Sequence, residues 1–306
     1  MTTLSVLICT YNRHELLDQA LNALIERTTE KPDQVVVVNG GDERADQVVE
    51  RYRGRHGIDL KLIKTVNRNL AASRNVGLPH CTGEIVAMTD DDAEVFPDWV
   101  TQLKRFHALH PEAGVIGGRV IGAPGGSSLI SQLADIVTFP LPSEAGYVRH
   151  SLPGVNVSYK RALIDQVGLQ DETLFRGEDV DFNHRIKALG AQIYFHPDIQ
   201  VLHHHRPTLR QFWRQHYMYG RAYYLVRRKW REMYSVYPRQ LRRPRDFAKA
   251  VYFVLAVFIQ PAQAALKLRS WRDRLLAYPI LLVNHALWKY GMILQWWIER
   301  KKPTAS

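Results

Sequence analysis

Short apolar runs alternate with helix-length amphipathic stretches along the first third of this 306-residue chain. The apolar runs cover residues 4–9, 34–38, 60–63 and 85–89, and the helical patterns cover about 15–26, 45–56, 70–78 and 98–110. Parallel strands need crossover connections of helical length, so this alternation predicts a mostly parallel, doubly wound α/β sheet. In such sheets ligands bind beyond the carboxyl ends of the strands, and the candidate site residues follow the predicted strands.

Charge is divided unevenly along the chain. Residues 1–205 hold 20 Lys/Arg and 26 Asp/Glu, a formal charge of −6, whereas residues 206–306 hold 21 and 4, a charge of +17. The 46% hydrophobic content excludes a disordered chain, and two cysteines are too few for a disulfide scaffold and favour a reducing, intracellular setting. We therefore predict an α/β domain at 1–205 and a separate basic helical region at 206–306, with a boundary near Arg206.

The basic region interleaves arginines with aromatic residues over 206–245 and then carries two apolar stretches, Ala250–Ile259 and Leu275–Ile298. Neither stretch has the roughly 18 uninterrupted apolar residues expected of a spanning helix. Helices lying in the interface of an anionic membrane therefore fit better. A helical bundle packed on the first domain, self-association as a homo-oligomer, and nucleic-acid binding by the Arg/aromatic stretch are the alternatives.

Three adjacent carboxylates, Asp90, Asp91 and Asp92, directly follow the strand predicted at 85–89. Like charges repel, so the cluster is costly unless a cation neutralises it. Such oxygen ligands suit Mg²⁺ or Mn²⁺, and Mg²⁺ typically binds one or two carboxylates together with substrate phosphates. In extended backbone, Asp90 and Asp92 would point to one side and offer a D-x-D pair to a metal diphosphate. A solvated acidic turn is the alternative.

Several motifs occur in a fixed order around this cluster: SVLICTYNR, VVVVNGGD, NRNLAASRNVGL, IVAMTDDDAEVFPDWV, PGVNVSYKRALIDQVG and FRGEDVDFNHRIKALG. In this order the chain resembles glycosyltransferase family two over about residues 4–205. That family comprises inverting, nucleotide-sugar-dependent enzymes with a GT-A fold. The resemblance implies transfer of a sugar from a nucleoside diphosphate to an acceptor hydroxyl, with Mn²⁺ or Mg²⁺ as cofactor.

The resemblance places the nucleotide and the donor sugar on residues that follow the strands. A tyrosine face for stacking and an arginine for phosphate suit Tyr11 and Arg13, although Tyr11 has a packing role as its alternative. The family usually carries an aspartate that contacts the base where this chain has Asn39, whose carbonyl can still accept from an N–H, so UDP and dTDP sugars are favoured. The full donor set that the resemblance implies is Thr10, Tyr11, Arg13, Asn39, Asn67, Arg74, Asp90, Asp91, Gly154 and Asn156.

The resemblance also implies the catalytic and metal-binding residues. Inversion needs a carboxylate that takes the proton of the acceptor hydroxyl, and Asp179 is the implied base, with Glu178 as the alternative. Helix N-terminal acids that complement the helix dipole are the competing interpretation. The implied metal ligands are Asp90, Asp92 and His203, with an outer role for His203 as the alternative. Arg74 would assist the leaving diphosphate or form an ion pair with the three aspartates.

The sequence lacks the motifs that are typical of other nucleotide-binding enzyme classes. No G-x-G-x-x-G or G-x-x-x-x-G-K-[ST] is present, and the glycine-rich loop of sugar-phosphate nucleotidyltransferases, the rival enzyme class, is absent from SVLICTYNR. The basic region points to a membrane rather than a nucleic acid as the partner. We therefore expect a glycan or lipid-linked acceptor and a location at the cytoplasmic face of the cell membrane.

Overall fold

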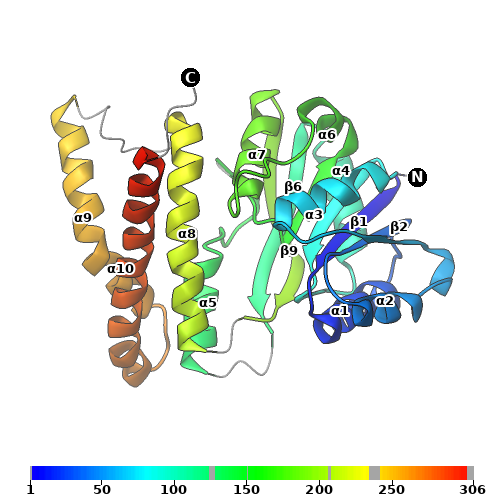
Figure 1. Ribbon diagram of the computed structural model, residues 1–306, viewed down its shortest axis with the longest axis horizontal. Helices are drawn as coiled ribbons and strands as arrows, with labels where there is room; N and C mark the ends of the chain where they lie inside the picture. The colour runs from blue at the N-terminus through cyan, green and yellow to red at the C-terminus, as the bar shows by residue number, and fades with distance from the viewer. Residues whose placement is uncertain (1, 124–127, 150, 206–207, 234–241, 302–306) are drawn as a thin grey trace. The chain divides into compact units, whose positions relative to one another are not determined.

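The computed structural model describes residues 2–123, 128–149, 151–205, 208–233 and 242–301 (Figure 1). The chain divides into two compact units: residues 1–123 with 141–204, and residues 124–140 with 205–306. The boundary predicted near Arg206 lies outside the described residues. Residues 124–140 fall inside the range predicted for the α/β domain but belong to the second unit, so the chain passes between the units more than once.

The first unit is built on one sheet whose strand order is β3-β2-β1-β4-β8-β6-β9-β5, with β7 paired to β9. Figure 1 shows these strands between flanking helices. The strands span Leu4–Thr10 (β1), Gln34–Asn39 (β2), Asp59–Lys64 (β3), Ile85–Asp90 (β4), Ala93–Val95 (β5), Ala113–Gly122 (β6), Gly146–Tyr147 (β7), Asn156–Lys160 (β8) and Gln192–His203 (β9).

The predicted α/β class is confirmed, but the sheet is mixed rather than mostly parallel. Strands β1 to β4 pair in parallel, as their apolar runs and helical connections predict. Strand β8 pairs antiparallel to both β4 and β6, and β5 pairs antiparallel to β9. For β5 the difference has a physical reason: only the turn at Asp91 and Asp92 separates it from β4, which is too short for the crossover helix that a following parallel strand needs.

The helices of the first unit span His14–Leu21 (α1), Glu43–Glu50 (α2), Leu70–Gly77 (α3), Trp99–Leu109 (α4), Arg161–Val167 (α6) and Glu178–Ala188 (α7). Helix α1 continues as a π-helical turn, Asn22–Arg27. The predicted helix at 45–56 is shorter in the structure: α2 ends at Glu50, and the chain beyond it is non-helical at Gly54, which has a φ of +76°. Asp42 and Asn69 cap α2 and α3 by accepting hydrogen bonds from backbone N–H groups.

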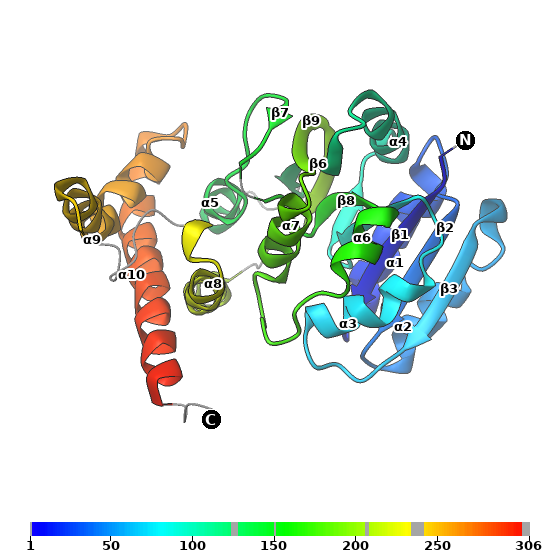
Figure 2. The ribbon, with the colours of Figure 1, turned by 90° about the horizontal axis from the view of Figure 1, so that it is seen from above.

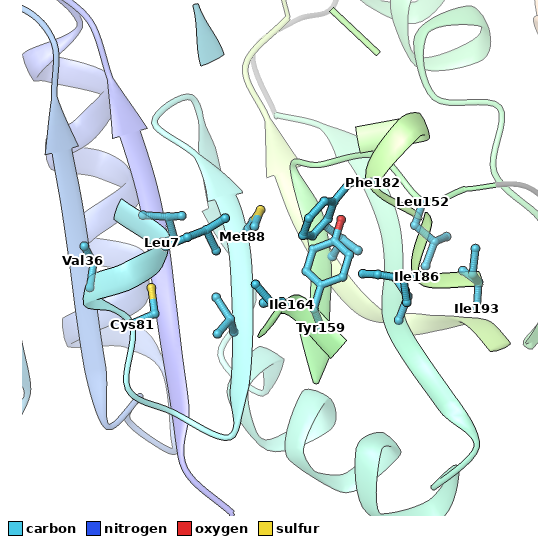
Figure 3. Close-up of a cluster of buried hydrophobic side chains, with 14 of the residues drawn as sticks. Leu7, Val36, Cys81, Met88, Leu152, Tyr159, Ile164, Phe182, Ile186 and Ile193 are labelled. Atoms are coloured by element: carbon cyan, nitrogen blue, oxygen red, sulfur yellow. The ribbon is translucent and has the colours of Figure 1, made fainter. Parts of the chain in front are cut away.

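A buried apolar cluster joins the sheet to α3, α6 and α7, which follow one another along one face of the sheet (Figure 2). Leu7, Val36 and Met88 contribute from the strands, and Phe182 and Ile186 contribute from α7 (Figure 3). Fully burying side chains of this size stabilises a fold by about 1.5–3 kcal/mol each. The cluster therefore fixes α3 and α7 on the sheet, and these two helices carry much of the site described below.

The second unit is helical. Its helices span Leu129–Thr138 (α5), Leu209–Lys229 (α8), Pro244–Ala265 (α9) and Trp271–Lys301 (α10). Helices α8 and α10 approach so closely that a Cβ atom added to Gly220 would lie 1.8 Å from the backbone oxygen of Trp288. An apolar cluster that includes Leu133, Phe212 and Leu281 ties α5, α8 and α10 together.

Helix α9 is longer than its apolar run predicts. The ten apolar residues from Ala250 lie within a helix of 22 residues, and α9 is the one helix in the described ranges that is long and apolar enough to cross a membrane. The uninterrupted apolar run is ten residues long, as predicted, but the helix that contains it has the length and composition of a spanning helix. Only 17% of its most apolar window is buried inside the protein.

Candidate functional site

The polar residues that follow β1, β2 and β4 meet at one edge of the sheet. Thr10 pairs with Asn39 across β1 and β2, and Cys9 pairs with Asp90 across β1 and β4. On the other side of β4, Thr89 pairs with Asn156, the first residue of β8. Parallel strands end at the same edge, so residues far apart in the sequence form one site there.

The three aspartates do not present the alternating faces expected of extended backbone, because β4 ends at Asp90 and the chain turns at Asp91 and Asp92. The Arg13 guanidinium donates to both Asp91 and Asp92, at 2.9 and 2.5 Å. The Thr10 hydroxyl donates to Asp91 at 2.8 Å. Burial raises the pKa of Asp91 to about 7, against the opposing effect of Arg13. The turn is thus held to β1 by Arg13 and Thr10.

Arg74 of α3 joins three segments of the site. Its guanidinium donates to Asp90 at 3.1 Å, to Glu178 at 3.1 Å and to the Gly154 carbonyl at 3.3 Å. Its side chain is only 3% exposed. Burial works against the charged guanidinium, but Asp90 and Glu178 outweigh it and raise the pKa of Arg74. Of the two roles predicted for Arg74, the structure shows the ion pair with the aspartate cluster.

Two acids begin helix α7. Gly177 precedes them with a φ of +80°, a left-handed conformation that glycine adopts without steric cost. Asp179 accepts from the backbone N–H of Gly154 at 3.0 Å and from that of Val180 at 2.8 Å. Glu178 is buried against Arg74, and burial together with the charge of Asp179 raises its pKa to about 7. Gly154 therefore links the two sides of the site, since its N–H contacts Asp179 and its carbonyl contacts Arg74.

The three histidines at the end of β9 have different partners. His203 Nε2 lies 3.4 Å from Asp92 Oδ1, and the backbone N–H of His204 donates to the Asp92 carbonyl. The His204 ring contacts Glu94 at 2.9 Å. His205 belongs to the second unit, where its ring contacts Asp135. Of the three, His203 is the one whose ring lies beside the aspartate turn.

The residues predicted to hold the nucleotide lie in different settings. The Tyr11 side chain is 51% exposed beside the site and is not a core packing residue. Asn39 is buried, and its amide donates to Asp46 and to the Asp42 carbonyl while accepting from the N–H of Gly41. Asn67 lies against Gly40, whose added Cβ atom would be 3.1 Å from the Asn67 Cβ.

Asn156 holds strands together in this structure. It is fully buried, and its amide donates to the carbonyls of Arg119 and Ile199 and accepts from the Trp99 indole. Gly154 lies two residues earlier, in the loop before β8, where its backbone contacts both Asp179 and Arg74. The two donor-binding residues predicted here thus have different surroundings. Gly154 contacts Asp179 of α7, whereas the Asn156 side chain is buried in the sheet.

Two of the three predicted metal ligands, Asp92 and His203, lie close enough together to bind one divalent ion. Asp92 and His203 supply a carboxylate oxygen and an imidazole nitrogen side by side, donors that suit Mn²⁺. Asp90, the third predicted ligand, bonds Arg74 instead, and the described ranges contain no group of three or more His, Cys, Asp or Glu arranged to hold a metal ion. Two protein ligands are enough for Mg²⁺-type sites that are completed by phosphate oxygens and water.

Some residues that organise the site were not among the predicted site residues, although Asn12 and Asn75 stand in the motifs SVLICTYNR and NRNLAASRNVGL. Asn12 has a φ of +55°, which asparagine tolerates, and its side chain accepts from the N–H of Asp42. Asn75 and Glu172 join α3 to the segment that precedes α7. An asparagine in the middle of a predicted helix is a weak signal of such a role. Asparagine is a poor helix former because its side chain competes for backbone hydrogen bonds, so its presence there suggests a use for the amide.

Replacing Arg74 by methionine is expected to destabilise the first unit by about 3–5 kcal/mol, because the buried Asp90 and Glu178 would lose the cation that pairs them and would stay charged without it or take up protons. The measurement is urea unfolding at pH 7.5. Arg53→Met breaks an exposed pair with Glu50 and serves as the matched control, with little or no expected loss of stability, because solvent screens such a pair. Equal losses in the two variants would contradict the linking role of Arg74.

Glu178 is expected to make stability depend on pH between its unfolded and folded pKa values. Burial raises that pKa from 4.5 to about 7, so the folded chain binds this proton more tightly than the unfolded chain. The contribution is complete below pH 4.5 and is lost as the pH rises to about 7, by at most about 1.4 kcal/mol per pH unit. Thermal unfolding of wild type and Glu178→Gln at several pH values measures it. Parallel profiles would show that Glu178 does not titrate in this range.

Comparison with known proteins places the chain in a family. The model of the glycosyl transferase family 2 matches residues 5–168. A glucosyl-dolichyl phosphate glucuronosyltransferase of Haloferax volcanii is 30% identical over 184 residues, which is 57% of this chain and 58% of that protein. A pre-mycofactocin glycosyltransferase of Mycobacterium tuberculosis is 30% identical over 156 residues, 49% of this chain and 33% of that protein. The matches therefore span about a third to somewhat over half of these relatives.

Solved structures support the fold. The mannosyltransferase PcManGT of Pyrobaculum calidifontis, solved with GDP-Man and Mn²⁺, aligns with a TM-score of 0.65 at 19% identity, covering 98% of this chain and 88% of that one. GalNAc-T7, solved with UDP, GalNAc and Mn²⁺, aligns with a TM-score of 0.54 at 18% identity, covering 67% and 44%. The predicted GT-A fold is thus confirmed. Since the family model matches more than half of the 306 residues, the chain belongs to glycosyltransferase family 2.

Proposed function

We propose that this enzyme transfers a sugar, with inversion, from a nucleoside-diphosphate sugar to an acceptor hydroxyl in a single displacement. The observation that carries the proposal is the continuous network from Asp179 through Gly154 and Arg74 to Asp90. This network joins the carboxylate at the start of α7 to the aspartates at the end of β4. A base on one side of the sugar and a centre that holds the diphosphate on the other are what inversion needs.

Asp179 is the proposed base. It takes the proton of the acceptor hydroxyl as the oxygen attacks the anomeric carbon, and the bond to the diphosphate breaks on the opposite face. The N–H groups of Gly154 and Val180 hold its carboxylate in place. Glu178, the alternative base, is buried and paired with Arg74, so it is less suited to accept a proton from a substrate.

The donor is proposed to lie over the ends of β1 and β4. Tyr11 is exposed there and offers a ring face to the base, and Arg13 lies beside the aspartates where a diphosphate would meet it. The sugar nucleotides of UDP and dTDP remain the favoured donors. Mannosyl and N-acetylgalactosaminyl donors appear with the similar structures, as GDP-Man and as UDP with GalNAc.

A Mn²⁺ or Mg²⁺ ion is the proposed cofactor. Asp92 and His203 would hold it, with Asp90 on the nucleotide side. When bound, such an ion neutralises the charge that develops on the leaving diphosphate. Arg13, which bonds both Asp91 and Asp92, keeps the turn in place for this role.

The proposed acceptor is a glycan or a lipid-linked hydroxyl at the cytoplasmic face of an anionic membrane, and the second unit is the proposed membrane-binding part. An exposed apolar stripe runs along α9 at helical spacing: Phe247, Val251, Val254, Leu255 and Phe258. Exposed cations flank it at Arg243, Arg245 and Lys249, and Trp296 and Trp297 are exposed on α10. Apolar side chains bordered by cations and tryptophans suit an anionic interface.

A panel of nucleoside-diphosphate sugars tests the catalytic proposal. With one donor and Mn²⁺, the wild type is expected to transfer the sugar, and Asp179→Asn is expected to lose about 10²–10⁴-fold in rate while still binding the donor. Rapid-mix assays give the rate and calorimetry gives donor affinity. Asp165→Asn changes an exposed acid on α6 and is the control. Full transfer by Asp179→Asn would refute its role as the base.

Vesicle binding tests the proposed membrane contact. The double variant Leu255→Glu/Phe258→Glu is expected to lose co-sedimentation with vesicles that contain anionic phospholipid, because it places charge in the apolar stripe. The double variant Gln260→Glu/Gln263→Glu adds the same charge to exposed positions of α9 and removes no apolar side chain. Equal losses in both variants would contradict insertion of the stripe, and undiminished binding by the first would do so as well.

A further inference from the structure

The segment Val167–Glu172, which leads into helix α7, is fixed by side chains that bond its backbone from two helices. These contacts come from α3 on one side and from α7 on the other. Asn75, Asn69 and Arg68 stand in the motif NRNLAASRNVGL, but none of them is among the site residues predicted from the sequence. Because Gly177 and Asp179 follow this segment closely in the chain, its position bears directly on the position of the proposed base.

Asn75 makes the most complete of these contacts. Its amide donates to the Gln170 carbonyl at 2.9 Å and accepts from the Gln170 N–H at 2.8 Å, so one side chain satisfies both backbone groups of one residue. The same amide donates to the Glu172 carboxylate at 3.0 Å. Asn75 and Gln170 are 6% and 3% exposed, so these bonds are made away from water, where an unmade bond is costly.

Further bonds hold the same segment. Asn69, at the start of α3, donates to the Glu172 carbonyl at 2.8 Å, and Arg68 pairs with the Glu172 carboxylate at 2.6 Å. From α7, the Arg185 guanidinium donates to the carbonyls of Val167 and Leu169. A turn then follows, in which the Leu174 N–H donates to the Asp171 carbonyl at 3.1 Å.

Helix α3 thus contacts both the path into α7 and its first residue. Asn75 fixes Gln170, and its neighbour Arg74 bonds Glu178 and the Gly154 carbonyl. Asp179 in turn needs the Gly154 N–H within hydrogen-bonding distance. A shift of the 170–172 backbone would move the start of α7 relative to Gly154.

We propose that Asn75 is a positioning residue for the transfer reaction, which sets the place of Asp179 through the backbone of Gln170. The inference rests on the proposed role of Asp179 as the base. Asn75 itself touches neither donor nor acceptor in this scheme. Its loss should therefore lower the rate of the chemical step and leave donor binding unchanged.

Asn75→Leu removes all three bonds with little change in side-chain volume. Its kcat is expected to fall about 10–100-fold, since a displacement of about 1 Å can cost that much, while the donor KM stays within about twofold. Added to Asp179→Asn, the same substitution should lower the residual rate no further, because it acts through Asp179. If Asn75→Leu fails to fold, Asn75→Asp, which keeps the bond from the Gln170 N–H, replaces it.

Gln170→Leu is the matched control, because the Asn75 bonds go to the backbone of Gln170 and survive the loss of its side chain. It changes a buried residue at the same junction and is expected to keep kcat within about twofold. Equal losses of kcat in Asn75→Leu and Gln170→Leu would overturn the proposal, since they would show a general effect of stability. So would a further loss of rate when Asn75→Leu is combined with Asp179→Asn.

Hydrogen exchange separates this inference from the proposed function. Amides of residues 168–180 should exchange faster in Asn75→Leu than in wild type or Gln170→Leu, whether or not the correct donor has been found. Unchanged exchange in Asn75→Leu would overturn the positioning role alone. Full transfer by Asp179→Asn would instead overturn the proposed base while leaving the exchange result intact.

Discussion

Carboxylates outnumber cations at the candidate site of this enzyme, and the rest of the site must compensate for this excess of negative charge. Asp90, Asp91, Asp92, Glu178 and Asp179 lie around two guanidinium groups, those of Arg13 and Arg74. Acids crowded away from water either take up protons or attract positive charge. The raised pKa values of Asp91 and Glu178 express the first response. The ion pairs with Arg13 and Arg74 express the second, and the divalent ion proposed to arrive with the diphosphate would add further positive charge.

Helix α3 carries the charged and polar side chains that hold the acidic segments of the site in place. It spans only Leu70–Gly77, yet adjacent residues on it bind the end of β4, the start of α7 and the segment before α7. Its apolar face is fixed on the sheet by the same cluster that holds α7. Electrostatic pairing and hydrophobic packing therefore act on the same pair of helices, so neither the acids nor the loop can shift without disturbing the core.

The parts of the fold that were predictable from the sequence are those with short-range signals. Strands β1, β2 and β4 are apolar runs because parallel strands inside a sheet are buried on both faces, whereas β3, at the edge of the sheet, is only partly buried. The antiparallel pairing of β8 was not predictable, since it depends on contacts between residues far apart in the chain. The acids of the site were found because they stand together in motifs. The role of Asn75 was not predictable, although Asn75 stands beside Arg74 in a motif, because its partner Gln170 lies 95 residues away. The side chains of Asn39 and Asn156, which were predicted to contact the donor, make hydrogen bonds within the protein.

Helix α5 gives the chain an unusual connectivity. The chain leaves the first unit after β6, contributes α5 to the second, returns to complete the sheet with β7, β8 and β9, and leaves again after His204. The first unit is thus interrupted in sequence, and the second is assembled from two separate pieces whose apolar side chains share one cluster. A gene fragment that ends at residue 205 would encode α5 without α8, α9 and α10, and would remove the side chains of those helices from the cluster that contains Leu133 and Ala134. The chain therefore crosses between the two units three times, after residues 123, 140 and 204. The second unit is not a simple C-terminal extension of the first.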